Sequence, residues 1–226
     1  MIVVDRNIEI SLLTKLKELD FVILTKENLN ILNGINTHPD MLVRPLLGKD
    51  VVVDLDNYEY YKNFLKGYNI YKSKKLYGDY PRDVALNFVV FKNYFIHNLK
   101  ATDEFVLSYY MAKGYKLIDV KQGYTKCNIV VGKNSLITSD VDIYNKLKDE
   151  INILLISHKG IELNNFNYGF IGGASGLVGD KIYFFGDIKY HKDGESIKNF
   201  LEYNKEKFVN LLDKPLKDYG SIIEIK

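Results

Sequence analysis

The stretch ASGLVGDKIYFFGD (174–187) consists of two apolar runs joined by a tight Gly-Asp turn, and the same pattern occurs three more times. The other copies are LVRPLLGKDVVVD (42–54), ALNFVVFKNYFIHN (85–98) and CNIVVGKNSLITSD (127–140). Aligned at the turn residues Asp50, Asn93, Asn134 and Asp180, successive copies lie 43, 41 and 46 residues apart. Such near-constant spacing indicates duplicated units, each of which begins with a β-hairpin.

A helix and a further strand are expected after each hairpin, because a capping residue, a helical apolar pattern and a short β-branched run follow in constant order. The expected helix starts are Asp56 or Asn57, Thr102 or Asp103, Ser139 or Asp140, and Asp193. The expected final strands are YNIYKS (68–73), YKLIDV (115–120), INILLIS (151–157) and, in a looser tail, SIIEI (221–225). The N-terminal residues 2–25 read as the same unit without its first strand. The chain therefore contains four full ββαβ units and one incomplete unit.

Units of this kind leave sheet edges bare unless they pack around a common axis, with helices outside and hairpin strands at the centre. We therefore predict an α/β fold in which residues 1–226 form a single domain, an α/β propeller of about five ββαβ units with pseudo-fivefold symmetry. A pair of separate three-layer α/β domains is the alternative. The sequence has no Pro/Ser/Gly-rich linker to divide two such domains.

Composition limits the classes of function. The 226 residues include 31 basic and 29 acidic side chains, for a net charge of +2, so neither nucleic acid nor an anionic membrane is an expected partner. A single Cys fits a reducing cytoplasm, and the N-terminal MIVVDRNIEI lacks the pattern of a secretory leader. We expect a cytoplasmic protein, and the oligomeric state does not follow from the sequence.

The hairpin-first order of five units resembles the pentein fold, the superfamily of guanidine-modifying enzymes that includes deiminases, dimethylarginine hydrolases and amidinotransferases. The phrases THPDM, YPRDVALN, GYTKCN and GFIGGASG are similar to those of an uncharacterised bacterial group within that fold. The resemblance implies a Cys thiolate that attacks a guanidinium carbon, a His acid/base and carboxylates that hold the guanidinium. It implies no cofactor.

His38 and Asp40 in THPD match the His-x-Asp spacing that the resemblance associates with the acid/base and a substrate-binding carboxylate. On a strand, residues two apart point to the same face, so both side chains would reach one pocket. Pro39 between them favours an edge or a turn. A Pro-containing turn capped by Asp40 is the structural alternative.

Cys127 is the only candidate for a thiolate nucleophile. A thiolate needs a neighbouring cation or helix N-terminus to depress its pKa, and a single intracellular Cys is otherwise a small buried apolar residue. In active family members the nucleophile typically belongs to the last unit. That unit here contains Ser175 and no Cys, so the sequence departs from the family pattern.

Polar residues recur where the first strands begin. The turn alignment places Arg44, Asn87 and Asn128 at one position and Asp40 and Asp83 at another. Such a set predicts either a polar central cavity that binds substrate or a hydrogen-bonded layer that holds the loops together.

The paired Gly172 and Gly173 resemble the Gly-Gly segment near the pentein pocket, where glycine permits a close approach of the backbone to a ligand. They form no nucleotide-binding fingerprint. The remaining His residues lack metal-ligand spacing, so no metal is expected.

Two functional hypotheses follow. The first is a Cys-dependent hydrolase or transferase of an arginine-like guanidino molecule, with Cys127 as nucleophile, His38 as acid/base and Asp40 and Asp83 as guanidinium ligands. Arg44, Asn87, Asn128, Gly172, Gly173 and Ser175 complete the substrate site. The second is a noncatalytic pentein-like ring that binds a metabolite or a macromolecule, since the same fold also serves as a ribosome-binding anti-association factor.

Overall fold

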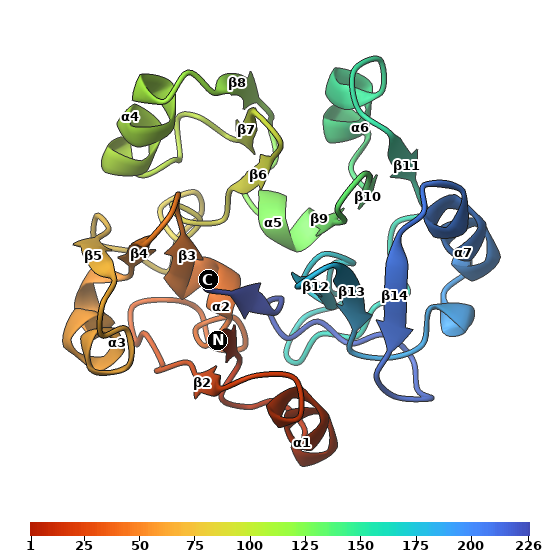
Figure 1. Cartoon of the computed structure of the whole chain (residues 1–226), viewed down its shortest axis with the longest axis horizontal. Coiled ribbons are helices and arrows are strands. Elements are labelled where there is room, and N and C mark those ends of the chain that lie inside the picture. The colour runs from red at the N-terminus through yellow and green to blue at the C-terminus, as the bar shows by residue number, and fades with distance from the viewer.

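A computed structural model describes residues 1–226, whose strands form five separate three-stranded sheets around a common centre and no closed barrel (Figure 1). In four sheets, consecutive strands pair so that the middle strand runs antiparallel to the first and parallel to the third. These strands are β3 (Val43–Pro45), β4 (Asp50–Val53) and β5 (Asn69–Lys72); β6 (Val89–Phe91), β7 (Tyr94–His97) and β8 (Lys116–Asp119); β9 (Ile129–Val131), β10 (Leu136–Thr138) and β11 (Ile153–Leu155); and β12 (Ser175–Val178), β13 (Lys181–Phe184) and β14 (Lys207–Asn210).

One helix per unit lies at the periphery and connects the second strand to the third (Figure 1). These helices are α1 (Ile10–Lys17), α3 (Tyr58–Phe64), α4 (Glu104–Ala112), α6 (Val141–Leu147) and α7 (Gly194–Tyr203). Two single-turn helices, α2 (Pro39–Leu42) and α5 (Thr125–Asn128), lie near the centre, each directly before a first strand. No helix has both the length and the apolar character that crossing a membrane requires.

The expected caps are confirmed for two helices. The carboxylates of Asp103 and Asp140 accept hydrogen bonds from backbone N–H groups in the first turns of α4 and α6. Asp54, and neither Asp56 nor Asn57, caps the 3₁₀ turn η1 (Leu55–Asn57) that precedes α3. Asp193 is the N-cap residue of α7, as expected, but its carboxylate makes no hydrogen bond to the helix and accepts from the backbone N–H of Ser157. A second 3₁₀ turn, η2 (Ile188–Tyr190), lies just upstream.

The C-terminal tail completes the first unit. Strand β1 (Ile2–Val4) pairs in parallel with β2 (Val22–Leu24) and antiparallel with β15 (Ile223–Glu224). The backbones of Met1 and Ile225 exchange two hydrogen bonds, of 3.0 and 2.8 Å. The strand that the N-terminal unit lacks in sequence is therefore supplied from the other end of the chain.

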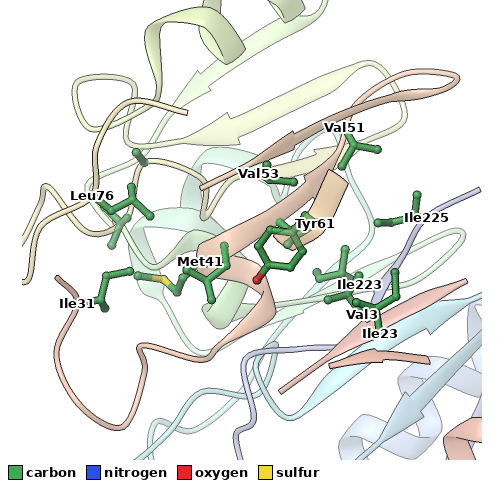
Figure 2. Packing of buried hydrophobic residues seen from close by; sticks show 14 of the residues in the cluster. Val3, Ile23, Ile31, Met41, Val51, Val53, Tyr61, Leu76, Ile223 and Ile225 are labelled. Carbon is green, nitrogen blue, oxygen red and sulfur yellow. The ribbon is translucent and has the colours of Figure 1, made fainter. Parts of the chain in front are cut away.

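The largest apolar cluster lies where the first two sheets meet the C-terminal strand. It contains Val3, Val51, Val53 and Ile223, and Tyr61 of α3 packs among them (Figure 2). The hydroxyl of the fully buried Tyr61 accepts a hydrogen bond from the backbone of Lys26. Packing between units, as well as within them, thus holds the two chain ends together.

The hairpin loops differ in length, and this corrects the turn alignment. Leu46 closes the first hairpin on Asp50 around a three-residue loop, whereas the loops of the other three hairpins contain two residues. When positions are counted back from the last residue before each loop, Arg44 lies two residues nearer to its loop than Asn87 and Asn128 lie to theirs. By the same count, Asp40 and Asp83 do not occupy equivalent positions. His38, Asp83, Tyr124 and Phe170 occupy the same place instead.

Candidate functional site

A buried polar layer lies between the central helical turns and the C-terminal segment. Asp40 Oδ2 accepts hydrogen bonds from Ser221 Oγ at 2.8 Å and from Cys127 Sγ at 3.2 Å. Lys126 Nζ donates to Ser221 Oγ at 2.9 Å and to the carbonyl oxygen of Gly172 at 3.2 Å. Asp40 Oδ1 has no partner. One carboxylate thus connects α2, α5 and the C-terminal segment.

His38 and Asp40 do not lie on a strand. Pro39 occupies the first position of α2, where its fixed φ favours a helix, and His38 precedes it. The two side chains therefore diverge. His38 lies between two carboxylates, with Nε2 3.9 Å from Asp5 Oδ2 and Nδ1 3.8 Å from Asp218 Oδ1, whereas Asp40 lies in the polar layer.

Cys127 is buried among polar groups. Its Sγ donates to Asp40 and accepts from Asn87 Nδ2 at 3.2 Å. Burial, together with the negative charges of Asp40 and Asp218, raises the pKa of the Cys127 thiol well above its ordinary value. This environment is the reverse of the one that activates a nucleophilic cysteine.

A cavity of about 270 Å³ opens beside this thiol. Its polar lining consists of His38, Cys127, Asn167 and Asp218, and it contains no Lys or Arg. Its apolar lining consists of Tyr124, Phe166, Tyr168 and Phe170 with Ile35, Met41 and Leu163. The cavity is therefore acidic on one side and aromatic on the others.

Neither Asp40 nor Asp83 lines this cavity. Asp83 lies behind Tyr124, whose hydroxyl donates to Asp83 Oδ2 at 2.5 Å. Burial raises the pKa of Asp83, and burial together with this carboxylate raises the pKa of Tyr124. Asp83 therefore positions one aromatic wall.

Arg44, Asn87 and Asn128 do not gather in the cavity either. Arg44 Nη2 donates to the carbonyl oxygen of Phe88 at 2.7 Å. Asn87 Oδ1 accepts from the backbone N–H groups of Lys126 and Cys127 at 2.8 and 3.1 Å, and Asn128 Nδ2 donates to the carbonyl oxygen of Tyr124. The two asparagines thus hold α5 in place.

Gly172 and Gly173 allow close packing of backbone around the polar layer. A Cβ on Gly172 would overlap the carbonyl oxygens of Lys126 and Ile129, and one on Gly173 would overlap the Asp218 carboxylate. Ser175 Oγ donates to the carbonyl oxygen of Gly172 at 3.2 Å and does not line the cavity. These three residues support the site and do not face it.

Sequence reasoning missed Asp218 and Ser221 and the aromatic residues Phe166, Tyr168 and Phe170. Ser221 has a left-handed φ of 75°, and a Cβ on the preceding Gly220 would overlap His38. If the C-terminal tail had been recognised as the first strand of the N-terminal unit, Asp218 and Ser221 would have aligned with the residues that directly precede the other hairpins. No group of three or more His, Cys, Asp or Glu side chains is placed to hold a metal ion.

Five three-stranded sheets of this order define the pentein fold, and solved structures confirm that assignment. DDAH from Pseudomonas aeruginosa, a mutant complexed with citrulline, matches with a TM-score of 0.59 and 9% identity, over 97% of this chain and 91% of that one. A dimethylarginine dimethylaminohydrolase adduct with 4-chloro-2-hydroxymethylpyridine matches with a TM-score of 0.57 and 10% identity, over 92% and 90% of the two chains. A dimethylarginine dimethylaminohydrolase adduct with S-methyl-L-thiocitrulline matches with a TM-score of 0.55 and 9% identity, over 97% of this chain and 92% of that one.

The chain belongs to a family of unknown function, DUF6873, whose model matches residues 3–223. No curated protein matches it in sequence. At these identities, the likeness to the solved structures shows the fold alone. The chain therefore has the pentein fold.

Proposed function

We propose that this protein binds a small guanidino molecule of the arginine type in the cavity beside Asp218, without forming a covalent bond to Cys127. The observation that carries the proposal is that a buried carboxylate and four aromatic residues line one cavity, which no Lys or Arg lines. A guanidinium is a planar cation that pairs with carboxylates and stacks on aromatic rings.

Asp218 is held rigidly for this role. Its Oδ2 accepts from the backbone N–H of Phe170 and its Oδ1 from that of Gly220, both at 2.9 Å. An ionised carboxylate accepts more than one hydrogen bond per oxygen, so both oxygens retain capacity for a guanidinium. Burial raises the pKa of Asp218, and a bound cation would act in the opposite direction by favouring the ionised form.

The volume of about 270 Å³ lies near the lower end of the range for ligand pockets, so the ligand is small. The structural neighbours were solved with citrulline and with S-methyl-L-thiocitrulline, which supports a pocket for a compound of that size.

Replacement of Asp218 with Asn is expected to weaken guanidino binding by about 10- to 100-fold, because a hydrogen bond to a charged group contributes about 1.5–3 kcal/mol. Isothermal titration with arginine and agmatine measures the effect, with citrulline as the analogue whose ureido side chain is uncharged. Asp149→Asn, at an exposed residue without a partner, is the matched control. Equal affinity for citrulline and arginine, unchanged binding by Asp218→Asn, or no binding at millimolar concentration would each contradict the proposal.

A Cys-dependent hydrolase or transferase is the second candidate. It is favoured by one observation: Cys127 and His38 line the same cavity. Such chemistry requires a thiolate, which the surroundings of Cys127 oppose.

Cys127 in the folded protein is therefore expected to react with iodoacetamide much more slowly at pH 7.5 than in urea-unfolded protein, because burial raises the pKa of the thiol and so lowers the fraction present as thiolate. Because the thiol pKa is raised, labelling should increase only at alkaline pH. Mass spectrometry of timed samples, with and without agmatine, measures the rates. Rapid labelling below pH 7 that agmatine blocks would establish an activated thiolate and favour the enzyme.

A further inference from the structure

A second cavity, of about 440 Å³, shares no lining residue with the first. Four segments each run from one cavity to the other: His38 to Arg44, Tyr124 to Val131, Phe170 to Leu177, and Asp218 to Ile222. Each passes through or alongside the polar layer of Asp40, Lys126 and Ser221. The two cavities therefore lie at opposite ends of the same central segments, with that layer between them.

The charge of the second cavity is opposite to that of the first. Arg44 and Lys126 line it, both are buried, and no carboxylate lies within 4.0 Å of either cationic group. The carboxylate that acts most on both is Asp40, whose Oδ2 already accepts from Ser221 and Cys127. Two buried cations thus share one carboxylate, and buried charge of this kind needs a counter-charge.

Arg44 has hydrogen-bond donors without partners beside this cavity. Its guanidinium lies 4.7 Å from the centre of the Phe88 ring, and Nη2 donates to the Phe88 carbonyl oxygen. This is its only hydrogen bond, and the buried Nε has no partner. The guanidinium therefore contacts the ring and retains unused N–H donors, which suit bidentate pairing with a carboxylate.

The rest of the cavity is mostly apolar. Strand residues such as Val89, Val90, Val131 and Leu177 line it, together with Ile222. The one acidic side chain at its rim, Glu224, forms an ion pair of 3.0 Å with Lys226. A ligand that fits these surroundings has a single anionic group and an apolar body.

We propose that this second cavity binds a small organic carboxylate with an aliphatic body, its carboxylate paired with Arg44 near Lys126. The volume falls within the usual range for small-molecule pockets. The site is separate from the guanidino cavity, so this proposal does not depend on the function proposed above.

Hexanoate is the probe, with hexanol and hexylamine as the neutral and cationic analogues of equal chain length. Methyl NMR titration of the full chain is expected to show shifts at Val89, Leu177 and Ile222, saturating with a Kd of about 1 mM or below for a ligand of this size. Hexanol and hexylamine should bind at least about tenfold more weakly. Hexanol has no negative charge to pair with the Arg44 guanidinium, and hexylamine is itself a cation.

Arg44→Met should weaken hexanoate binding at least about tenfold, and Lys49→Met, an exposed basic residue of the same hairpin, should leave it unchanged. If Arg44→Met does not fold, Val90→Trp keeps both cations and fills the cavity, and it should abolish the same methyl shifts. Hexanol binding as tightly as hexanoate, preference for hexylamine, or unchanged binding by Arg44→Met or Val90→Trp would overturn the proposal. Hexanoate-induced methyl shifts confined to residues of the Asp218 cavity would also overturn the proposal.

Discussion

Replacement of Asp40 with Ala is expected to lower the free energy of unfolding by about 3–5 kcal/mol, the cost of removing one partner from a buried charge cluster. Asp40 accepts from Ser221 and Cys127 and is the carboxylate that most offsets the charges of Lys126 and Arg44. Without it both cations remain buried, and two donors lose their acceptor. Urea unfolding followed by circular dichroism measures the difference.

The effect should depend on pH in a defined direction. Burial lowers the pKa of Lys126 to about 8, below its unfolded value, so the folded state releases this proton first and stability rises with pH above 8. Once Lys126 is neutral it no longer needs Asp40, and the cost of Asp40→Ala should therefore be smaller at pH 9.5 than at pH 7. Arg44 keeps its charge, so some cost remains.

Asp149→Ala is the control for this prediction, because Asp149 is exposed and makes no hydrogen bond or ion pair. We expect it to change stability by less than about 0.5 kcal/mol. A loss at Asp40 of under about 1 kcal/mol at pH 7, or a loss that grows with pH, would show that the layer does not depend on this carboxylate.

Deletion of residues 222–226 is expected to have the largest effect on folding. Ile222, Ile223 and Ile225 are each at most 4% exposed, and their burial contributes about 2–3 kcal/mol apiece, or about 6–9 kcal/mol in all. That is comparable with the whole stability of a typical domain, about 5–15 kcal/mol. The deletion also leaves β1 with one bare edge.

The truncated chain should therefore lose the dispersed amide spectrum of a folded protein, or unfold at a much lower urea concentration. Deletion of Lys226 alone removes an exposed residue outside the strand and is the matched control. A truncated protein that unfolds at the same urea concentration as the full chain would show that the C-terminal strand does not complete the first sheet.

Much of the fold could be predicted because its signals are local. Turn residues between apolar runs mark the hairpins, and Asp103 and Asp140 cap the helices that follow. The same local reasoning misplaced Arg44 by two positions. The first hairpin loop has one extra residue, and the alignment residue Asp50 follows that loop, whereas Asn93 and Asn134 lie within theirs. Pro39, predicted to form an edge or turn, begins a helical turn because its fixed φ suits that position equally well.

The candidate site was predicted only in part. His38 and Cys127 were identified and do line one cavity, whereas the carboxylate that lines it with them is Asp218 and not Asp40 or Asp83. The raised pKa of the Cys127 thiol follows from burial and from neighbouring carboxylates, which sequence does not reveal.

The sequence by itself determined the order of strands and helices within each unit, since turns, caps and apolar periodicity act over a few residues. Only the tertiary structure decided that β15 completes the first sheet and that Asp40 meets Cys127 and Ser221, 87 and 181 residues away. Contacts over such separations depend on how the units pack around the centre. For the same reason, packing alone separates the acidic aromatic cavity from the cationic one.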